Sequence, residues 1–425
     1  MPACGGERLT IWHQTNDARA SARLENGAWW LDLEIGTWPI ESGQSVLAEA
    51  KVSGRSEVDR SILRKASWSH NSGVNSYWSA KLGPFAAGDS VDYSLSAQSP
   101  RQKASVGPFQ VRIGPKLFLA ILWHQHQPSY ADRLCATPKG RFLFPWVRLH
   151  ALRDYYSMAS LLERHPKVHL TINLTPVLLR QIEDYVERGF TDRALELTHT
   201  PTPELSSEDR EELAKTFFDA DWHNEIYPHP RYKELFDKRG RGQPLTDADI
   251  TDLRMWFNLA WFAPEFQRGE VTLPDQTIAS VRRFLEKGAG FGEQDIAGMV
   301  AEQVKIMRNI VAIHRKLQNA GQIEVSTTPF YHPILPLLHD TDKAILDRDG
   351  TVLPTRFSFP EDADAQVGNA YAFYSKLFNR PPRGMWPAEG AVGESVVAHF
   401  RNHGVRWIAT DKGVLTRSGE WGYDA

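Results

Sequence analysis

The segment Leu117-Phe118-Leu119-Ala120-Ile121-Leu122-Trp123 is an unbroken apolar run. A strand with one solvent-exposed face alternates apolar and polar residues. A parallel strand that is buried on both faces is a continuous apolar run. The run therefore predicts a strand in the interior of a parallel sheet, with helices on both sides.

Similar but shorter strands recur after this run, and helical segments separate them. A helix is expected at about 148–164, and a second apolar strand at 168–174 precedes Thr175-Pro176, where proline opens another helix. The remaining strands are expected at 323–326, 384–386 and 405–410. This alternation predicts an α/β barrel or an open α/β sheet.

The N-terminal part of the chain, residues 1–113, has a different pattern. Short alternating runs such as Trp29-Trp30-Leu31-Asp32-Leu33-Glu34-Ile35 are separated by clusters of Gly, Asn, Ser and Pro. Several such strands predict a β-sandwich of the immunoglobulin-like or carbohydrate-binding-like kind. Such a module either binds polysaccharide or serves as a passive scaffold, and the sequence leaves both readings open.

Residues 117–425 are expected to form the α/β domain, which is interrupted by a polar, helix-rich stretch at about 200–320. This stretch falls between the second and third strands and carries aromatic clusters, including Trp256 and Trp261. We interpret it as a helical insertion over the mouth of the barrel.

The composition is that of an ordinary globular protein, with 425 residues of which 41% are hydrophobic and 24% charged. A formal net charge of −3 and the lack of a dense Lys/Arg run argue against a nucleic-acid partner. The 14 Trp and 12 Tyr residues favour a carbohydrate ligand only modestly, because such side chains also fill large cores.

Cys4 and Cys135 are the only cysteines, so the sequence offers neither a disulfide framework nor a Cys-x-x-Cys zinc motif. The N-terminus MPACGGERLT has no signal-peptide pattern, and no apolar run reaches the roughly 18–20 residues of a membrane helix. We therefore expect a cytoplasmic protein without a membrane partner, and the oligomeric state stays open.

Polar side chains follow nearly every expected strand. In parallel α/β barrels the active site lies at the carboxyl ends of the strands, so these side chains are expected to converge. In strand order they are His124 and His126, Asn173 and Thr175, His332, Trp386 and Glu389, and Asp411.

His124 and His126 alternate at a strand end, so both are expected to point the same way. Such a pair can bind a metal if Asp411 or His332 supplies a third ligand. Alternatively, neutral imidazoles near pH 7 can donate hydrogen bonds to sugar hydroxyls. If the pair has only a structural role, one imidazole forms a hydrogen bond with the edge of the sheet and the other faces the cleft.

The segment Gly384-Met385-Trp386-Pro387-Ala388-Glu389-Gly390 places a lone carboxylate close to an aromatic ring and among small residues. A sugar-cleaving carboxylate must approach an anomeric carbon closely, and an aromatic face can carry the pyranose ring. The competing interpretation of Glu389 is an acid in an exposed turn.

Two of the acids that follow Glu389 lie at expected ends of helices or strands. Glu394 starts an expected helix at 394–403 and is interpreted as structural, because the helix dipole favours a carboxylate there. Asp411 is interpreted either as the cap of a turn or as an acid or substrate anchor at the end of the fifth strand.

With these residues in view, the chain resembles glycoside hydrolase family 57, particularly its amylopullulanase-like and α-amylase-like members. Four stretches carry the resemblance, together with the helical insertion around Pro230-Arg231-Tyr232 and Trp256 to Trp261. In chain order they are Trp123-His124-Gln125-His126-Gln127-Pro128, Ser326-Thr327-Thr328-Pro329-Phe330-Tyr331-His332-Pro333-Ile334, Met385-Trp386-Pro387-Ala388-Glu389-Gly390 and Trp407-Ile408-Ala409-Thr410-Asp411.

The resemblance implies a seven-stranded (β/α) barrel and retaining cleavage or transfer at α-1,4 or α-1,6 bonds of an α-glucan polysaccharide or oligosaccharide. It implies no cofactor and no metal in the chemistry. Glu389 would be the nucleophile that forms a covalent glycosyl-enzyme, and a second carboxylic acid would protonate the leaving oxygen. The substrate-binding residues would be His124, His126, His332, Trp386, Asp411, Trp256 and Trp261.

The sequence departs from the family pattern near its end. The family's general-acid Asp belongs to a later motif, whereas this chain stops at Trp421-Gly422-Tyr423-Asp424-Ala425. We therefore expect a truncated record with an incomplete barrel, and a fragment that lacks the acid is expected to be inactive.

Two other functions are compatible with the residues. The histidine pair would also suit a metal-dependent hydrolase on a related barrel, such as a polysaccharide deacetylase or an α-mannosidase. A sandwich joined to an incomplete barrel would suit a non-catalytic carbohydrate-binding protein.

Overall fold

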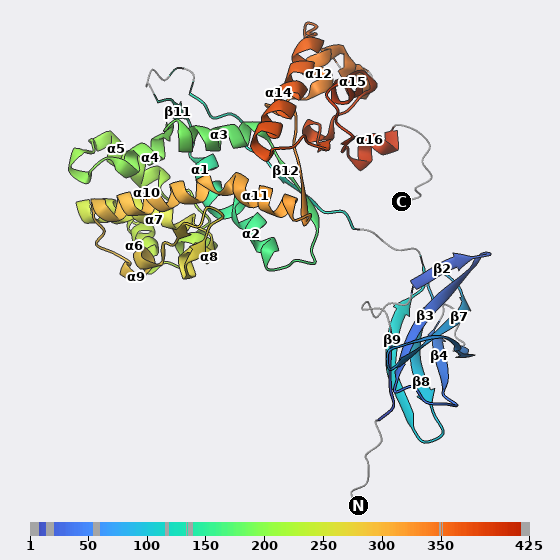
Figure 1. The fold of residues 1–425 in the computed structure, drawn as a ribbon. Helices are drawn as coiled ribbons and strands as arrows, with labels where there is room; N and C mark the ends of the chain where they lie inside the picture. The colour runs from blue at the N-terminus through green and yellow to red at the C-terminus, as the bar shows by residue number, and fades with distance from the viewer. Residues whose placement is uncertain are drawn as a thin grey trace, which may run out of the picture. The chain divides into compact units, whose positions relative to one another are not determined.

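The computed structural model describes residues 8–13, 21–53, 60–114, 119–132, 134, 139–347, 350 and 352–417 (Figure 1). The chain divides into two compact units, Met1–Leu119 and Ala120–Ala425. Both cysteines, Leu117 and Phe118 of the first apolar run, and the terminal segment 421–425 lie outside the described residues.

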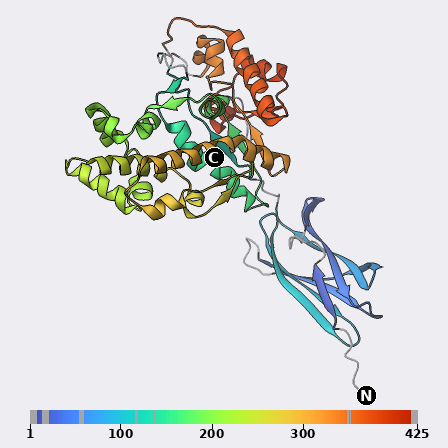
Figure 2. The same cartoon turned by 60° about the vertical axis from the view of Figure 1, so that its left-hand side comes forward.

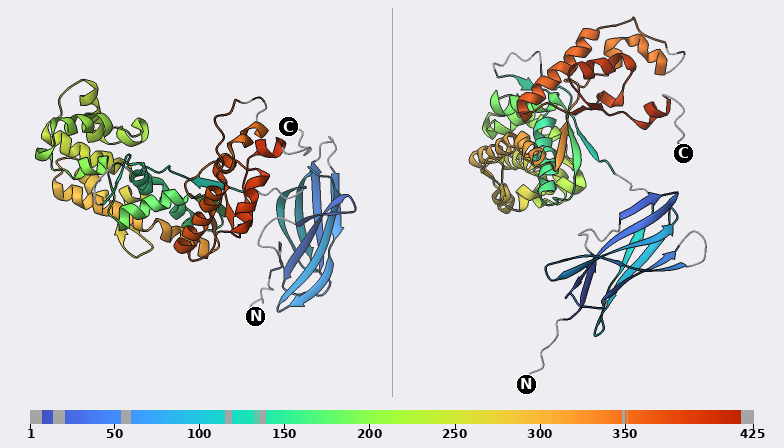
Figure 3. Two further views of the ribbon diagram at one scale, coloured as in Figure 1. Left: turned by 90° about the horizontal axis from the view of Figure 1, so that it is seen from above. Right: turned by 45° about the vertical axis from the view of Figure 1, so that its right-hand side comes forward.

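The first unit consists of two antiparallel sheets, which Figure 3 shows from two sides. One sheet has the strand order β1-β3-β7-β6, with β2 paired to β3, and the other has the order β5-β4-β8-β9. The strands are β1 (Thr10–His13), β2 (Ser21–Glu25), β3 (Ala28–Trp38), β4 (Ser45–Ser53), β5 (Arg60–Lys65), β6 (Ser67–Ser72), β7 (Asn75–Phe85), β8 (Ser90–Gln98) and β9 (Lys103–Arg112).

Alternating burial along these strands builds a core between the two sheets. Leu31, Leu33 and Ile35 of β3 are buried, as are Val91, Tyr93 and Leu95 of β8. Because side chains alternate across a strand, the residues between them face outward. The expectation of a sheet-rich N-terminal region is confirmed.

Five parallel strands of the second unit lie in the order expected for the α/β domain, and a separate two-stranded pair, Arg141–Phe142 with Thr191–Asp192, is parallel as well. Strands β10 (Leu122–Gln125), β12 (Leu170–Leu174) and β16 (Ile323–Ser326) form one sheet, and β17 (Gly384–Met385) pairs with β18 (Trp407–Ile408). A parallel bridge between Thr327 and Met385 joins the two groups. The strands therefore follow one another in chain order, as they do in a (β/α) barrel.

The first apolar run is less buried than the sequence predicts. Its described strand begins only at Leu122, and the Leu119 and Ile121 side chains are 81% and 37% exposed. The reason is that β10 has a strand neighbour on one side only among the described residues, whereas the central strand β12 buries Ile172 and Leu174 fully. The α/β class is confirmed, while closure into seven strands stays an expectation.

Helices follow the first two barrel strands at the expected places. The helix expected at 148–164 is interrupted by a π-helical turn, and the helix after β12 begins at Pro176. These elements are α1 (Trp146–His150), η1 (Ala151–Tyr155), α2 (Ser157–Glu163) and α3 (Pro176–Glu187).

A long helical segment then separates β12 from β16. Its helices are α4 (Arg193–His199), η2 (Thr202–Glu204), α5 (Ser207–Thr216), η3 (Trp222–Ile226), α6 (Pro230–Gly240), α7 (Asp247–Ala260), α8 (Pro264–Arg268), α9 (Arg282–Lys287), α10 (Glu293–Arg308) and α11 (Ile310–Asn319). Only Asn309 separates α10 from α11, and the two helices run on as a nearly continuous rod in Figure 2. Short pairs β11 (Arg141–Phe142) with β13 (Thr191–Asp192) and β14 (Val271–Thr272) with β15 (Ile278–Ala279) flank these helices.

A buried ionic network ties the helical segment to α1. The fully buried Arg148 bonds the Asp192 carboxylate with two of its nitrogens, at 2.8 and 3.2 Å. Its third nitrogen donates to Asn258 of α7 and Gln303 of α10. Burial of this charge is tolerated because every guanidinium nitrogen has an acceptor.

The remaining helices follow β16 and the two last strands. They are α12 (Leu335–His339), η4 (Thr341–Lys343), α13 (Ala344–Asp347), α14 (Pro360–Phe378), η5 (Ala388–Gly390), α15 (Glu394–Asn402) and α16 (Lys412–Arg417). Across the described residues, no helix combines the length and the hydropathy that a membrane crossing requires.

Candidate functional site

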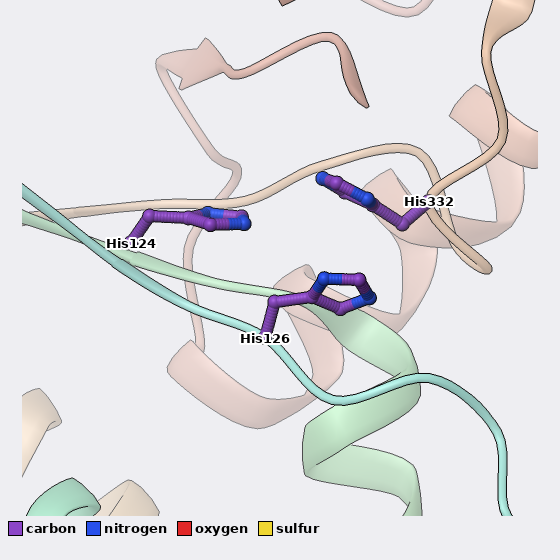
Figure 4. Close-up of side chains that lie close together, drawn as sticks. All are labelled: His124, His126 and His332. Carbon is purple, nitrogen blue, oxygen red and sulfur yellow. The ribbon is translucent and has the colours of Figure 1, made fainter. Parts of the chain in front are cut away.

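Three histidines from two distant parts of the chain meet at the ends of β10 and β16. His124 belongs to β10, His126 lies two residues further on, and His332 follows β16 (Figure 4). Their rings approach one another, with centroids 4.1 Å apart for His126 and His332 and 5.2 Å apart for His124 and His332. One ligand nitrogen from each ring lies within 4.8 Å of the other two.

Asn173, at the end of β12, fixes the orientation of His124. The Asn173 amide nitrogen donates to the Thr327 carbonyl and to Ser326 Oγ, both at 2.9 Å. Because a carbonyl can only accept, the Asn173 amide oxygen must face His124 Nδ1, which lies 2.7 Å away. The Nδ1 proton of His124 is thereby assigned, and its Nε2 is left for another partner.

The electrostatic environment keeps two of the three rings neutral at pH 7. Burial, followed by the neighbouring His126 and His124, lowers the pKa of His332 to about 4. Burial and then His124 lower the pKa of His126, while Glu389 opposes this shift. His332 Nε2 is buried and has no hydrogen-bond partner among the described residues. A neutral imidazole with a free nitrogen can bind either a hydroxyl or a metal ion.

Glu389 lies beside this cluster, in the turn after β17. One of its carboxylate oxygens is 3.9 Å from His332 Nδ1, and its side chain is 73% exposed. Both residues have left-handed backbones, with φ of 55° at Glu389 and 57° at His332. This conformation is uncommon for residues other than glycine, although histidine adopts it more often than most, and it occurs preferentially at functional sites.

Trp386 forms an aromatic wall next to His124. Its ring centroid is 4.8 Å from that of His124, and its backbone N–H donates to the Thr327 carbonyl at 2.8 Å. Its indole Nε1 is buried without a hydrogen-bond partner among the described residues. The structure thus brings Trp386, Glu389 and the three histidines together.

Asp411 lies close to this group but is engaged as a helix cap. Its Oδ1 accepts the Val414 N–H at 2.8 Å at the start of α16. A Cβ added at Gly390 would contact the other Asp411 oxygen, so the carboxylate lies against the turn that carries Glu389. The cap is therefore present, and a role towards substrate stays a prediction.

Glu394 is the first residue of α15, in the position expected for a structural acid.

The two tryptophans of the helical segment lie in other surroundings. Trp256 of α7 is 3% exposed, donates its Nε1–H to the Gly288 carbonyl and packs against His229. Trp261 packs edge-on against His150 at 5.1 Å. Among the ring contacts of the described residues, neither tryptophan touches the three histidines. Their expected contact with substrate remains untested, and the burial of Trp256 identifies it as a core residue.

Sequence reasoning missed a polar relay that holds the loop after His126. Gln127 donates to the Tyr155 hydroxyl at 3.1 Å and accepts the Tyr130 hydroxyl at 2.6 Å. Gln181 of α3 anchors the same loop by accepting the Tyr130 N–H at 2.8 Å. The only sequence signal was the position of Gln127 within the His-Gln-Pro stretch. The relay explains why a glutamine follows the second histidine.

Comparisons with known proteins found partial matches to enzymes that act on carbohydrates. A stretch of 91 residues is 37% identical to part of an isomaltosyltransferase from Sporosarcina globispora. The matched stretch makes up 21% of this chain and 7% of the relative. The α-amylase AmyC of Thermotoga maritima is 16% identical over 68% of this chain and 38% of its own, with a TM-score of 0.33. A GH57-type branching enzyme from Pyrococcus horikoshii is 15% identical over 68% of this chain and 40% of its own, with a TM-score of 0.31.

The chain thus spans well under two thirds of the length of these relatives. The sequence pattern of one family, however, covers most of the second unit. Residues 120–422, more than half of the chain, match the model of glycosyl hydrolase family 57. The chain therefore belongs to glycosyl hydrolase family 57.

Proposed function

We propose that this chain is a retaining glycosidase or transglycosidase that acts on α-glucans, with Glu389 as its nucleophile. One observation carries the proposal: an exposed carboxylate in a left-handed turn lies next to three imidazoles and an indole at neighbouring strand ends. Family membership supports glycosidic-bond chemistry, and the name of the isomaltosyltransferase relative supports glucan as the substrate class.

In the proposed mechanism, a Glu389 oxygen attacks the anomeric carbon. The bond between that carbon and the leaving oxygen breaks, and the leaving oxygen takes a proton from a second carboxylic acid. Water or the hydroxyl of another glucan then attacks the anomeric carbon, gives its proton to the same acid and releases Glu389. The outcome is hydrolysis in the first case and transfer in the second.

The neighbouring rings would hold the sugar during these steps. Because His126 and His332 stay neutral at pH 7, each can accept and donate hydrogen bonds to hydroxyls. The unpartnered His332 Nε2 and Trp386 Nε1 are directed polar groups that substrate hydroxyls would satisfy. The Trp386 ring would support the apolar face of the pyranose.

The decisive experiment replaces the proposed nucleophile. Glu389→Gln in the complete gene product should lower kcat on amylose and pullulan by several orders of magnitude, as expected for loss of a nucleophile. Glu389→Gly with added azide should form a glycosyl azide of inverted configuration, because azide then attacks the face that the carboxylate occupied.

The matched control is Glu394→Gln, which removes a nearby acid at the start of α15 and should leave kcat close to wild type. If Glu389→Gln keeps full activity, or azide gives no inverted product with an otherwise folded variant, Glu389 is not the nucleophile.

Asp411 can be tested as the second carboxylic acid in the same assay. If it only caps α16, Asp411→Asn should lower stability by about 1 kcal/mol or less and leave kcat unchanged. If it donates the proton, kcat should fall most on substrates with poor leaving groups and little on activated aryl glucosides, which need less protonation.

The three histidines also favour a second candidate, a metal-dependent hydrolase. Their ligand nitrogens lie within 4.8 Å of one another, and His124 is held through its Nδ1 as metal-bound imidazoles often are. Elemental analysis of the purified chain distinguishes the two functions. Stoichiometric zinc together with chelator-sensitive hydrolysis would support the metal enzyme over the retaining glycosidase.

A further inference from the structure

A row of aromatic side chains crosses the outer face of the sheet β1-β3-β7-β6 in the sandwich. The strand register places Trp12 opposite Gly36, Gly36 opposite Tyr77, and Tyr77 opposite His70. Facing positions in neighbouring strands point to the same side of a sheet. Four strands therefore contribute one row, in which glycine is the only residue without a ring.

Two rings of this row stack on each other, and the third lies against the sheet. His70 and Tyr77 are stacked, with centroids 4.9 Å apart and planes 20° apart. A Cβ added at Gly36 would overlap with the Trp12 indole, so the indole lies directly on the backbone of β3. The absence of a side chain at Gly36 is what lets Trp12 lie against the strand instead of standing away from it.

This row is not needed for the core of the sandwich. The neighbouring positions Ile35 and Trp78 are buried and face inward, whereas His70 is exposed and Tyr77 is half-buried. Ring stacking on an outer face adds little to packing between the sheets. An exposed and ordered aromatic row of this kind is typical of a binding surface.

Polar groups surround the stacked pair and form a cavity with it. The cavity has a volume of about 340 Å³. Ile35 and Trp78 contribute to its lining, and the remaining lining residues are Glu34, Ser69, His70, Ser72, Tyr77 and Ser79. Glu34 pairs with Ser79 in the adjacent row of the same face. A ligand here meets the stacked rings in the centre and hydroxyl or carboxylate oxygens at the edge, and the cavity volume is within the size range of small-molecule sites.

We propose that this outer face binds a glucan chain, with a pyranose ring over Tyr77 and His70. A pyranose has apolar C–H faces and a rim of hydroxyls, which matches rings flanked by Glu34 and Ser79. An apolar protein segment would leave these polar groups without partners. The choice of an α-glucan over other glycans rests on the function proposed for the second unit.

The test measures retention of the full 425-residue chain in gels that contain soluble amylose. Tyr77→Ala and His70→Ala should each weaken binding roughly tenfold, as loss of an aromatic contact to the sugar would. Tyr77→Phe keeps the ring and should retain most of the affinity. Turnover of a short soluble maltooligosaccharide by the complete gene product should be unchanged by all three substitutions, because none of them lies in the second unit.

Trp68→Ala is the matched control. Trp68 is 57% exposed, but it pairs with the inward-facing Trp78 and so lies on the other side of β6. The proposal is overturned if Tyr77→Ala and His70→Ala bind amylose as wild type does, or if Trp68→Ala weakens binding equally. Tyr77-dependent retention on xylan or cellulose gels but not on amylose would overturn the α-glucan assignment.

Failure of this proposal is distinguishable from failure of the proposed function. Full activity in Glu389→Gln would remove the nucleophile assignment without changing amylose retention. Because His70 lies on an exposed edge strand, His70→Ala also decides the outcome if Tyr77→Ala does not fold.

Discussion

At the scale of single residues, the backbone conformations of Glu389 and His332 are the most informative features of the site. Five non-glycine residues with positive φ are found among the described residues, and these two face each other at 3.9 Å. The left-handed turn presents the Glu389 carboxylate outward from a buried turn, where Ala388 and Gly390 are covered. The sequence does not reveal this conformation, because glutamate rarely adopts it and most histidines do not.

Asn173 is expected to support the site without touching the reacting atoms. Asn173→Ala removes the acceptor that holds His124 Nδ1 and should lower kcat/KM by roughly 10- to 100-fold, which corresponds to about 1–3 kcal/mol. Steady-state kinetics on a soluble maltooligosaccharide would measure this loss.

The control for Asn173 is Ser326→Ala. This change removes one acceptor of the Asn173 amide but leaves the bonds to Thr327 and His124. Its activity should stay near wild type. Equal losses in both variants would show that Asn173 acts only through stability.

At the scale of elements, the sequence predicts best what depends on local pattern. The strand at 323–326 and the helix starting at Pro176 are found at the expected residues because periodicity and the helix-opening proline are local signals. The exposed start of the first apolar run could not be predicted, because it depends on which strands flank β10. The register that aligns Trp12 with Tyr77 across β3 is likewise a pairing property that no single segment encodes.

Strands β17 and β18 are packed so closely that β17 requires a glycine. A Cβ added at Gly384 would overlap with the Trp407 ring, which is also held by a bond from its Nε1 to Glu324 at 3.1 Å. Gly384→Ala should lower the free energy of unfolding by about 1–3 kcal/mol through overpacking. Denaturant titration would measure the change.

Gly240→Ala provides the comparison, because no atom lies within 4 Å of a Cβ added at that helical position. This variant should be as stable as wild type or slightly more stable, since alanine favours helix. If Gly384→Ala leaves the free energy of unfolding as unchanged as Gly240→Ala does, the prediction is wrong and the Trp407 ring can move away from the added methyl group at little cost.

His314 on α11 should make stability depend on pH. It is fully buried, and burial lowers its pKa from 6.5 to about 4. A hydrogen bond from Nδ1 to the Ile310 carbonyl, at 2.8 Å, raises the pKa but is the smaller effect. Between pH 6.5 and 4 the unfolded chain therefore binds more protons than the folded chain. The stabilisation is complete above pH 6.5 and is lost as the pH falls towards 4, by up to about 3 kcal/mol.

Thermal unfolding at a series of pH values would test this dependence. His314→Leu should flatten the curve between pH 6.5 and 4, whereas His165→Leu changes an exposed histidine and should leave its slope as it is in wild type. An unchanged slope in His314→Leu would contradict the assignment of this titration.

At the scale of the whole molecule, the two units have separate hydrophobic cores. Leu33 belongs to the core of the sandwich and Ile172 to the core of the second unit, and both are at most 1% exposed. Each substitution to alanine should cost about 2–5 kcal/mol in its own unit. Calorimetry should therefore show Leu33→Ala lowering one transition and Ile172→Ala lowering the other. A single transition shifted by both variants would show that the units unfold together.

The gathering of the candidate site could be predicted at this scale, although its chemistry could not. Parallel strands in chain order bring their carboxyl ends to one edge, so His124, His126, His332 and Glu389 were expected together. The protonation of His124 depends on Asn173, and the pKa of His332 depends on burial, which are properties of packing. The roles of these residues remain predictions until the variants are measured.

The pairing of β12 with β16 has a consequence for the order of folding during synthesis. Strand β12 ends at Leu174, and its neighbour β16 begins at Ile323. The whole helical segment is translated between these two residues. On a ribosome, β10 and β12 can pair early, while β16 emerges only after the helices have been made. Loop-closure entropy grows only with the logarithm of loop length, so this late pairing costs little more than an early one. The nascent chain therefore presents His124 and His126 long before His332 arrives to complete the cluster.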